Sequence, residues 1–215
     1  LEWYRIGWDH HRLVDETVVF VQSALALLQR RATVVKTSFR DLYRDRLGID
    51  PFIADEPTLR ATLGDIEIDP NGLTRDDWLD LLMTHRLQPG FDRDGILVVY
   101  DYPPSQCALA KLRAGPDGEA AVAERFELYF GPLELANGYH ELTAAPEQRA
   151  RFLRDHVVRG ERGAVRPPPD EALLAAIAAG LPACAGVALG IERLLMAMLG
   201  TDRIADVLAF DSSRA

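Results

Sequence analysis

The chain has 215 residues, of which 48% are apolar and 27% are charged. This composition is typical of a globular protein with a sizeable core, and it excludes a fibrous or wholly disordered chain. The 33 acidic and 24 basic residues give a net charge of −9, opposite in sign to that of a general nucleic-acid binder. Two isolated cysteines, Cys107 and Cys184, indicate neither a disulfide framework nor a zinc site.

Three further features bear on location and partners. No apolar run reaches the roughly 18 residues that a membrane-spanning helix needs. The first residues do not resemble a signal peptide, so we predict a cytoplasmic protein with no membrane partner. The densest basic stretch, 149–166, is interleaved with acidic residues, which favours a solvated helix face over a nucleic-acid site.

The first half of the chain predicts mainly helices after one strand. Residues 1–6 alternate so that Trp3 and Arg5 face one way and Glu2, Tyr4 and Ile6 the other. In chain order, the patterns predict a strand over 1–6, a helix over about 10–31 capped by Asp9 and an extended stretch over 33–35. They then predict a helix capped by Thr37 or Ser38 and ending at Gly48, a helical piece over 58–63, and a helix over about 74–87 that opens with a Thr74–Asp77 capping box.

The second half mixes strands and helices. Its patterns predict a buried strand over 95–100, a loop over 101–106 and a hairpin of strands 124–130 and 133–137. Two helices follow, over 146–158 and 170–179, joined by a proline-rich linker. The chain then has a glycine-spaced strand over 186–190, a helix over 191–199 and an apolar stretch over 204–210.

The hairpin is the most informative local pattern. If its turn centres on Gly131-Pro132, then Tyr129 lies opposite Glu134 and Glu127 lies opposite Ala136. Glu127 and Glu134 then share one face of the hairpin, where like charges cost energy unless a cation lies between them. A divalent cation or an ammonium group would offset that cost; the alternative is that both carboxylates simply face solvent.

Two further segments suggest a site. The stretch Asn137-Gly138-Tyr139-His140-Glu141 is acidic and aromatic, which suits a cationic amine substrate. We interpret His140 as a surface or supporting residue rather than a catalytic base. In the segment 186–193, glycines allow close approach to a strand, and Arg193 in the next helix offers a donor fork for phosphate.

These segments together resemble the class II lysyl-tRNA synthetases, and more closely the short paralogues that ligate (R)-β-lysine to elongation factor P. The sequence that carries the resemblance runs from Phe126-Glu127 through Glu134 to Thr143. In addition, residues 186–193 are similar to class II motif 3, and residues 1–5 are similar to the end of motif 2. The ligases are favoured by Ala188 in place of the synthetases' glycine, by Ser105-Gln106, and by the acidic charge.

The resemblance implies an α+β fold, with a class II synthetase-like antiparallel sheet flanked by helices and incomplete at its N-terminal side. It implies a single catalytic domain over 1–215 without motif 1, which builds the family's homodimer, and without the first half of motif 2. We therefore expect that the 215 residues alone do not form an adenylate.

The implied activity is the ATP-dependent activation of (R)-β-lysine, or lysine, and its transfer to a lysine side chain of elongation factor P, with tRNA an unlikely partner. The alternatives are a lysyl-tRNA synthetase catalytic fragment and a non-catalytic amino-acid-binding paralogue. The implied roles are Mg²⁺ binding by Glu127 and Glu134, ATP binding and catalysis by Glu134 and Arg193 with Leu135 and Gly190, and amino acid binding by Glu2, Tyr4, Asn137, Glu141 and Ala188.

Overall fold

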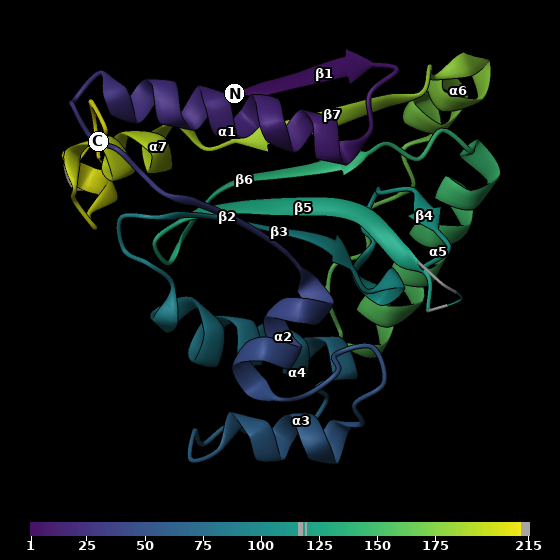
Figure 1. Ribbon diagram of the computed structural model, residues 1–215. Coiled ribbons are helices and arrows are strands. Elements are labelled where there is room, and N and C mark those ends of the chain that lie inside the picture. The colour runs from purple at the N-terminus through teal and green to yellow at the C-terminus, as the bar shows by residue number, and fades with distance from the viewer. Residues whose placement is uncertain (116–117, 119, 212–215) are drawn as a thin grey trace.

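One sheet organises the computed structural model, which describes residues 1–115, 118 and 120–211. Its strands follow the order β1-β7-β6-β5-β3-β2, and β4 pairs with β5 off this path (Figure 1). All neighbours are antiparallel except β2 and β3, so the expected antiparallel sheet is present with one parallel pair at its edge. The strands are β1 Glu2–Ile6, β2 Val34–Ser38, β3 Ile96–Tyr102, β4 Leu112–Arg113, β5 Val122–Phe130, β6 Leu133–His140 and β7 Cys184–Leu189.

The helices begin at the capping residues that the sequence offers. Asp9, Ser38 and Asp55 each accept a backbone N–H in the first turn, and Thr74 with Asp77 forms the expected capping box. The α-helices are α1 His10–Ala26, α2 Phe39–Leu47, α3 Glu56–Leu63, α4 Arg75–Leu82, α5 Ala145–Glu161, α6 Glu171–Gly180 and α7 Ile191–Leu199. Short turns of π- or 3₁₀-helix are η1 Met83–Leu87, η2 Gln88–Gly90, η3 Pro104–Gln106 and η5 Ile204–Asp206.

The structure departs from several predicted boundaries, and three departures are the clearest. Helix α1 ends at Ala26 instead of residue 31, because the chain turns through a left-handed conformation at Gln29. Strand β3 continues through Asp101 and Tyr102, where a loop is expected, by way of a register shift. Strand β4 is too short for a periodic signal, and the sequence patterns do not predict it.

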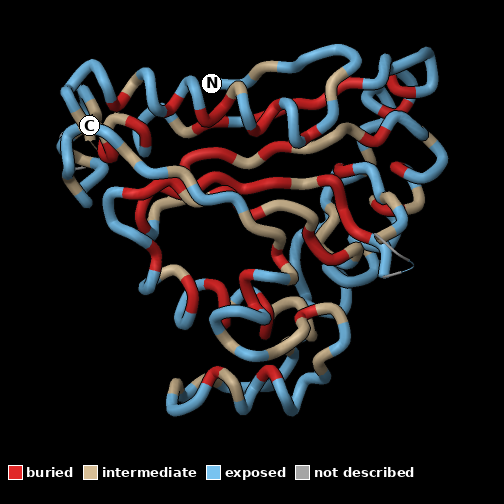
Figure 2. Tube along the Cα trace, in the orientation of Figure 1, coloured by how far each residue is buried: buried red, intermediate tan, exposed pale blue. Residues whose placement is uncertain are grey.

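Two apolar clusters cover opposite faces of the sheet. The first packs α1 and α7 against β3, β5, β6 and β7, with Leu13, Phe126 and Leu128 fully buried. The second packs the helical segment α2–α4 against β3 and β5, with Tyr43, Leu79 and Tyr129 at its centre. Figure 2 shows burial concentrated along the central strands, whereas β1 is largely exposed.

A β-bulge sets the register of the β5–β6 hairpin. Tyr129 lies opposite Glu134, as predicted, but Glu127 lies opposite Asn137, so the predicted pairing with Ala136 is wrong. The physical reason is that β6 advances two residues where β5 advances one, which leaves Leu135 as the extra residue. Because of this extra residue, the side chains of Glu134 and Asn137 both project to the face of the sheet that carries Glu127.

Candidate active site

One face of the sheet collects the predicted site residues. In the strand register, Ala188 of β7 lies between Glu2 of β1 and Asn137 of β6, and Gly186 lies between Tyr4 and Tyr139. Because paired residues project to the same side, this row continues through Asn137 to Glu127 on β5. Strand alternation therefore places side chains from four strands on one surface. We call this surface the site face, and the face covered by α1 and α7 the α1 face.

Glu127 lies deepest on the site face and is held by its neighbours. Its Oε1 accepts a hydrogen bond from Arg125 Nη2 at 2.5 Å, and Asn137 Nδ2 lies 3.5 Å from the same oxygen. The Tyr129 hydroxyl donates to Oε2. Burial and the Glu127 charge raise the pKa of Tyr129 far above its usual range, so this phenol stays a donor.

Glu134 is more open and lies against the start of α7. Burial and the charge of Glu127 raise the pKa of the Glu134 carboxyl. Arg193 Nη1 is 3.6 Å from its Oε2 and donates to its backbone carbonyl at 2.9 Å. The Gly190 amide donates to the Leu135 carbonyl at 2.9 Å, which fixes the turn before α7. The four residues expected at the nucleotide are thus in one place.

Glu141 is a largely buried acid without a counter-charge. Among the residues that the structure describes, none forms an ion pair or hydrogen bond with its carboxylate, and burial raises its pKa to about 7. A Cβ atom at Gly186 would lie 2.5 Å from Glu141 Oε1 and 2.4 Å from Tyr4 Cε1. A larger residue at this position would displace the Tyr4 ring or the Glu141 carboxylate, so the glycine lets the two side chains meet over β7.

The sequence patterns did not identify Arg125, although it connects several site residues. Its guanidinium donates to Glu127, lies 3.4 Å from Asn137 Oδ1, and packs over the Tyr102 ring with 4.5 Å between the guanidinium carbon and the ring centroid. It also donates to the Gln106 carbonyl at 3.0 Å. Its spacing of two residues from Glu127 on a strand is the signal that places both on one face.

Gln106 extends this network into the helical segment α2–α4. Its side chain donates to Asp80 at 2.8 Å, and burial raises the pKa of the Asp80 carboxyl to about 6. A cavity of about 380 Å³ lies here, and its lining includes Asp80, Arg125 and Glu127. The site therefore has a polar wall behind Glu127 as well as the open area over β1 and β7.

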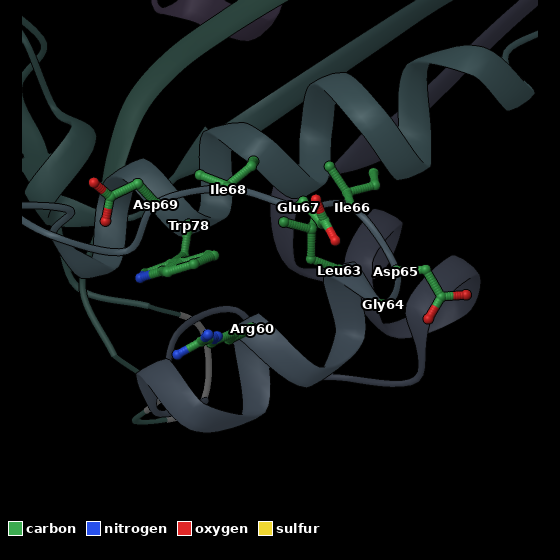
Figure 3. Close-up of a pocket in the computed structure, with 9 residues that line it drawn as sticks. All are labelled: Arg60, Leu63, Gly64, Asp65, Ile66, Glu67, Ile68, Asp69 and Trp78. Atoms are coloured by element: carbon green, nitrogen blue, oxygen red, sulfur yellow. The ribbon is translucent and has the colours of Figure 1, made fainter.

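A larger hollow of about 610 Å³ lies elsewhere, beside α3. Figure 3 shows Arg60 and Trp78 facing each other across it, with the carboxylates of Asp65 and Asp69 directed outward (Figure 3). None of the sheet residues described above lines it.

His140 is also outside the site, because its Nδ1 pairs with Glu124 at 2.6 Å on the α1 face. This position agrees with a supporting role.

The fold and the site face define the class of protein. The sequence profile of the family "tRNA synthetases class II (D, K and N)" matches residues 34–214, and the chain belongs to this family. No helix among the described residues has the length and apolar character needed to cross a membrane.

Several individual proteins with similar sequences share one specific name. The chain is 43% identical to an elongation factor P (R)-β-lysine ligase of Vibrio cholerae over 218 aligned residues. It is 42% identical to the ligase of that name from Vibrio atlanticus and 40% identical to the one from Salmonella gallinarum. Each alignment covers 100% of this chain and 65% of the relative, so the chain spans just under two thirds of the length of these ligases.

Proposed function

We propose that the protein is a ligase that activates (R)-β-lysine with ATP and transfers it to a lysine side chain of elongation factor P. The names of the similar proteins and the class II family support this activity. The observation that carries it is Glu141, a half-buried carboxylate that has no cationic partner among the described residues. A distal ammonium group of the substrate would supply that partner.

The amino acid site follows from the row of side chains across β1, β7 and β6. Glu141 and the Tyr4 ring would bind the distal ammonium, since a carboxylate and an aromatic face both attract a cation. Asn137 and Glu2 flank Ala188 and would contact the reacting end of the amino acid. The Ala188 methyl group lies between them and would shape this end for a β-amino acid.

The nucleotide would lie beside Glu134 and Arg193. Arg193 offers a planar donor fork for phosphate oxygens, and the segment from Gly190 to Leu135 supplies backbone that a nucleotide base or ribose can approach. The donor set fits Mg²⁺, because Glu134 is accessible and Glu127 keeps lone pairs beyond those used by Arg125 and Tyr129. Bound there, Mg²⁺ would neutralise phosphate charge.

The proposed chemistry has two steps. A carboxylate oxygen of the amino acid attacks the α-phosphorus of ATP, and the bond to the β-phosphate oxygen breaks to release pyrophosphate. The lysine ε-amine of elongation factor P, having lost a proton, then attacks the activated carbonyl carbon, and AMP leaves. Arg193 and Glu134 would act by charge neutralisation and positioning, which dominate such phosphate chemistry.

A lysyl-tRNA synthetase activity is the second candidate, because the matched family comprises tRNA synthetases. The net charge of −9 argues against a tRNA partner. We also propose a cytoplasmic location, which agrees with two free cysteines.

One experiment separates these activities. A full-length protein that contains these 215 residues together with motifs 1 and 2 is incubated with ATP, Mg²⁺ and radiolabelled (R)-β-lysine or lysine, and with elongation factor P or tRNA. Label on elongation factor P, lost in Glu141→Gln, supports the proposed ligase. Label on tRNA would establish the synthetase instead, and amino acid binding without label on either acceptor would establish the non-catalytic paralogue.

A further inference from the structure

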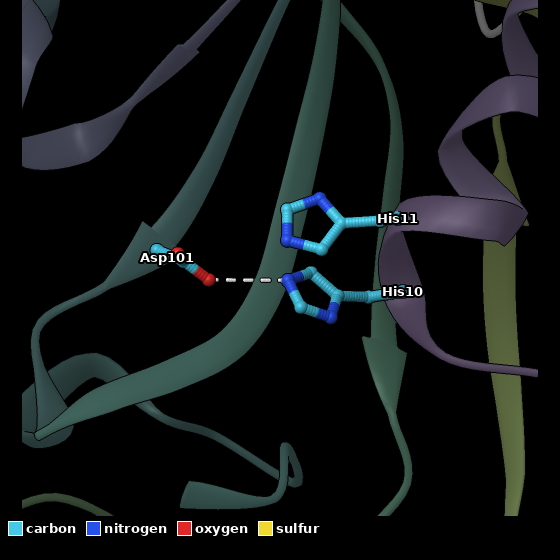
Figure 4. A group of neighbouring side chains, drawn as sticks. All are labelled: His10, His11 and Asp101. Atoms are coloured by element: carbon cyan, nitrogen blue, oxygen red, sulfur yellow. Dashed lines mark hydrogen bonds and ion pairs between the residues drawn. The ribbon is translucent and has the colours of Figure 1, made fainter. Parts of the chain in front are cut away.

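A second cluster of metal-binding side chains lies on the α1 face, away from the candidate active site. His10 and His11 open α1, and Asp101 projects from β3 toward them. One ligand atom from each of the three residues lies within 4.8 Å of the other two. Figure 4 shows the two imidazole rings side by side, with the Asp101 carboxylate at their edges (Figure 4).

The backbone on both sides holds this arrangement. Asp9 caps α1 by accepting the Arg12 amide at 2.8 Å, which fixes the first turn that carries both histidines. Asp101 has φ +57°, a conformation that favours glycine, at the register shift in β3. A bulge of this kind redirects a side chain, and here it directs the carboxylate to His10, whose Nε2 is 3.1 Å from Asp101 Oδ1.

The donor types select a particular class of ion. Two imidazoles and one carboxylate are ligands for Zn²⁺ and similar divalent transition metals, whereas Mg²⁺ prefers oxygen alone. Ligand atoms around tetrahedral zinc lie about 3.4 Å apart, so the exposed His11 ring must move inward from its present position. His10 is buried, and its Nε2, which faces Asp101, would be its ligand atom; its Nδ1, without a hydrogen-bond partner among the described atoms, lies on the other side of the ring (Figure 4).

The charges around the cluster support a cation. Arg113 pairs with the second oxygen of Asp101 and lies 3.4 Å from Glu124 Oε1, so it orients the carboxylate as supporting residues of metal sites do. Glu124 partly neutralises the positive charge of Arg113, and Asp9 contributes negative potential near both histidines. We propose that His10, His11 and Asp101 form a site for a divalent transition-metal ion, with Zn²⁺ as the best match, which clamps α1 to β3.

The test is a Zn²⁺ titration of the protein against a chromophoric chelator, with excess Mg²⁺ present to occupy the carboxylates of the site face. We expect one Zn²⁺ per chain. His11→Phe keeps a ring beside Tyr100, at 4.9 Å in the native pair, and Asp101→Asn keeps a residue that tolerates positive φ. Each variant is expected to raise the Kd for Zn²⁺ about tenfold or more.

His85→Phe is the matched control, because His85 is an exposed histidine outside the cluster. It should bind Zn²⁺ as the native protein does, and circular dichroism confirms that all variants are folded. Cobalt(II) gives a second readout, since coordination by His11 would produce visible absorption bands that His11→Phe lacks. Absence of a stoichiometric Zn²⁺ site in the native protein, or equal Zn²⁺ affinity in His11→Phe and His85→Phe, would overturn the proposal.

Discussion

The two faces of the central sheet use the same strands for opposite purposes. On the α1 face, alternate residues such as Phe126 and Leu128 pack into a closed apolar core. On the site face, their neighbours Arg125, Glu127 and Asn137 form a charged network that continues into an open surface over β7 and β1. The apolar core of the α1 face therefore extends over β3, β5, β6 and β7, whereas the site face is apolar where α2–α4 cover β3 and β5 and keeps buried charge beside them that a ligand can use.

The largest expected effect comes from breaking the α1 face. Phe126→Ala should lower the free energy of unfolding by about 3–5 kcal/mol, because a fully buried ring is removed and leaves a cavity. The matched truncation on the site face, Tyr4→Ala, should cost under about 1 kcal/mol, since Tyr4 is 58% exposed. Urea unfolding of both variants measures the difference, and equal losses would contradict the difference in burial between the core under α1 and the open part of the site face.

Next in size is the Arg125–Glu127 pair. Arg125→Leu should lower the free energy of unfolding by about 3 kcal/mol, because Glu127 is left buried without its cation. Adding Glu127→Gln should recover most of this loss, as the unpaired charge is then removed. A double-mutant cycle measures the coupling, and strictly additive losses would show that Arg125 does not hold Glu127.

Glu141 should produce a pH dependence on the site face. Its pKa is raised to about 7 in the folded protein, so the folded state binds more protons than the unfolded state between about pH 4.5 and 7. The free energy of unfolding should therefore fall as pH rises through this window. The expected decrease is about 2 kcal/mol, after allowance for the partial exposure of the Glu141 side chain.

The control for this prediction is Glu141→Gln, which cannot titrate. Its free energy of unfolding should lose this pH-dependent fall while other titrating groups remain unchanged. Denaturant unfolding at pH 5, 6 and 7.5 compares the two proteins. Parallel pH profiles would show that Glu141 is not the group responsible.

The smallest expected effect is on substrate choice. Ala188→Gly removes one methyl group between Glu2 and Asn137 and should broaden amino acid acceptance toward α-lysine, by about tenfold, the usual scale for a methyl-sized change in a pocket. Pyrophosphate exchange with (R)-β-lysine and α-lysine, measured in a full-length protein that contains motifs 1 and 2, gives kcat/KM for each. An unchanged ratio would contradict the role proposed for Ala188.

Much of the local structure follows from short-range signals. Capping residues predicted the starts of α1, α2 and α4, and Gly48 and Gly200 predicted the ends of α2 and α7. Alternation along residues 1–6 correctly separated Trp3 and Arg5 from Glu2 and Tyr4. The sequence motif around the hairpin also indicated the family, because it combines acidic residues and glycines in a characteristic order.

The sequence by itself therefore determined most element types, the family and most polar residues of the site face, Arg125 excepted, since these depend on contacts within a few residues or on a motif. Only the tertiary structure decided how those residues meet. The Leu135 bulge moved Asn137 opposite Glu127, Gly186 allowed Tyr4 and Glu141 to approach each other, and Arg125 tied the hairpin to Gln106. Register and long-range contacts settle such features, because a one-residue shift turns every following side chain to the other face of a strand.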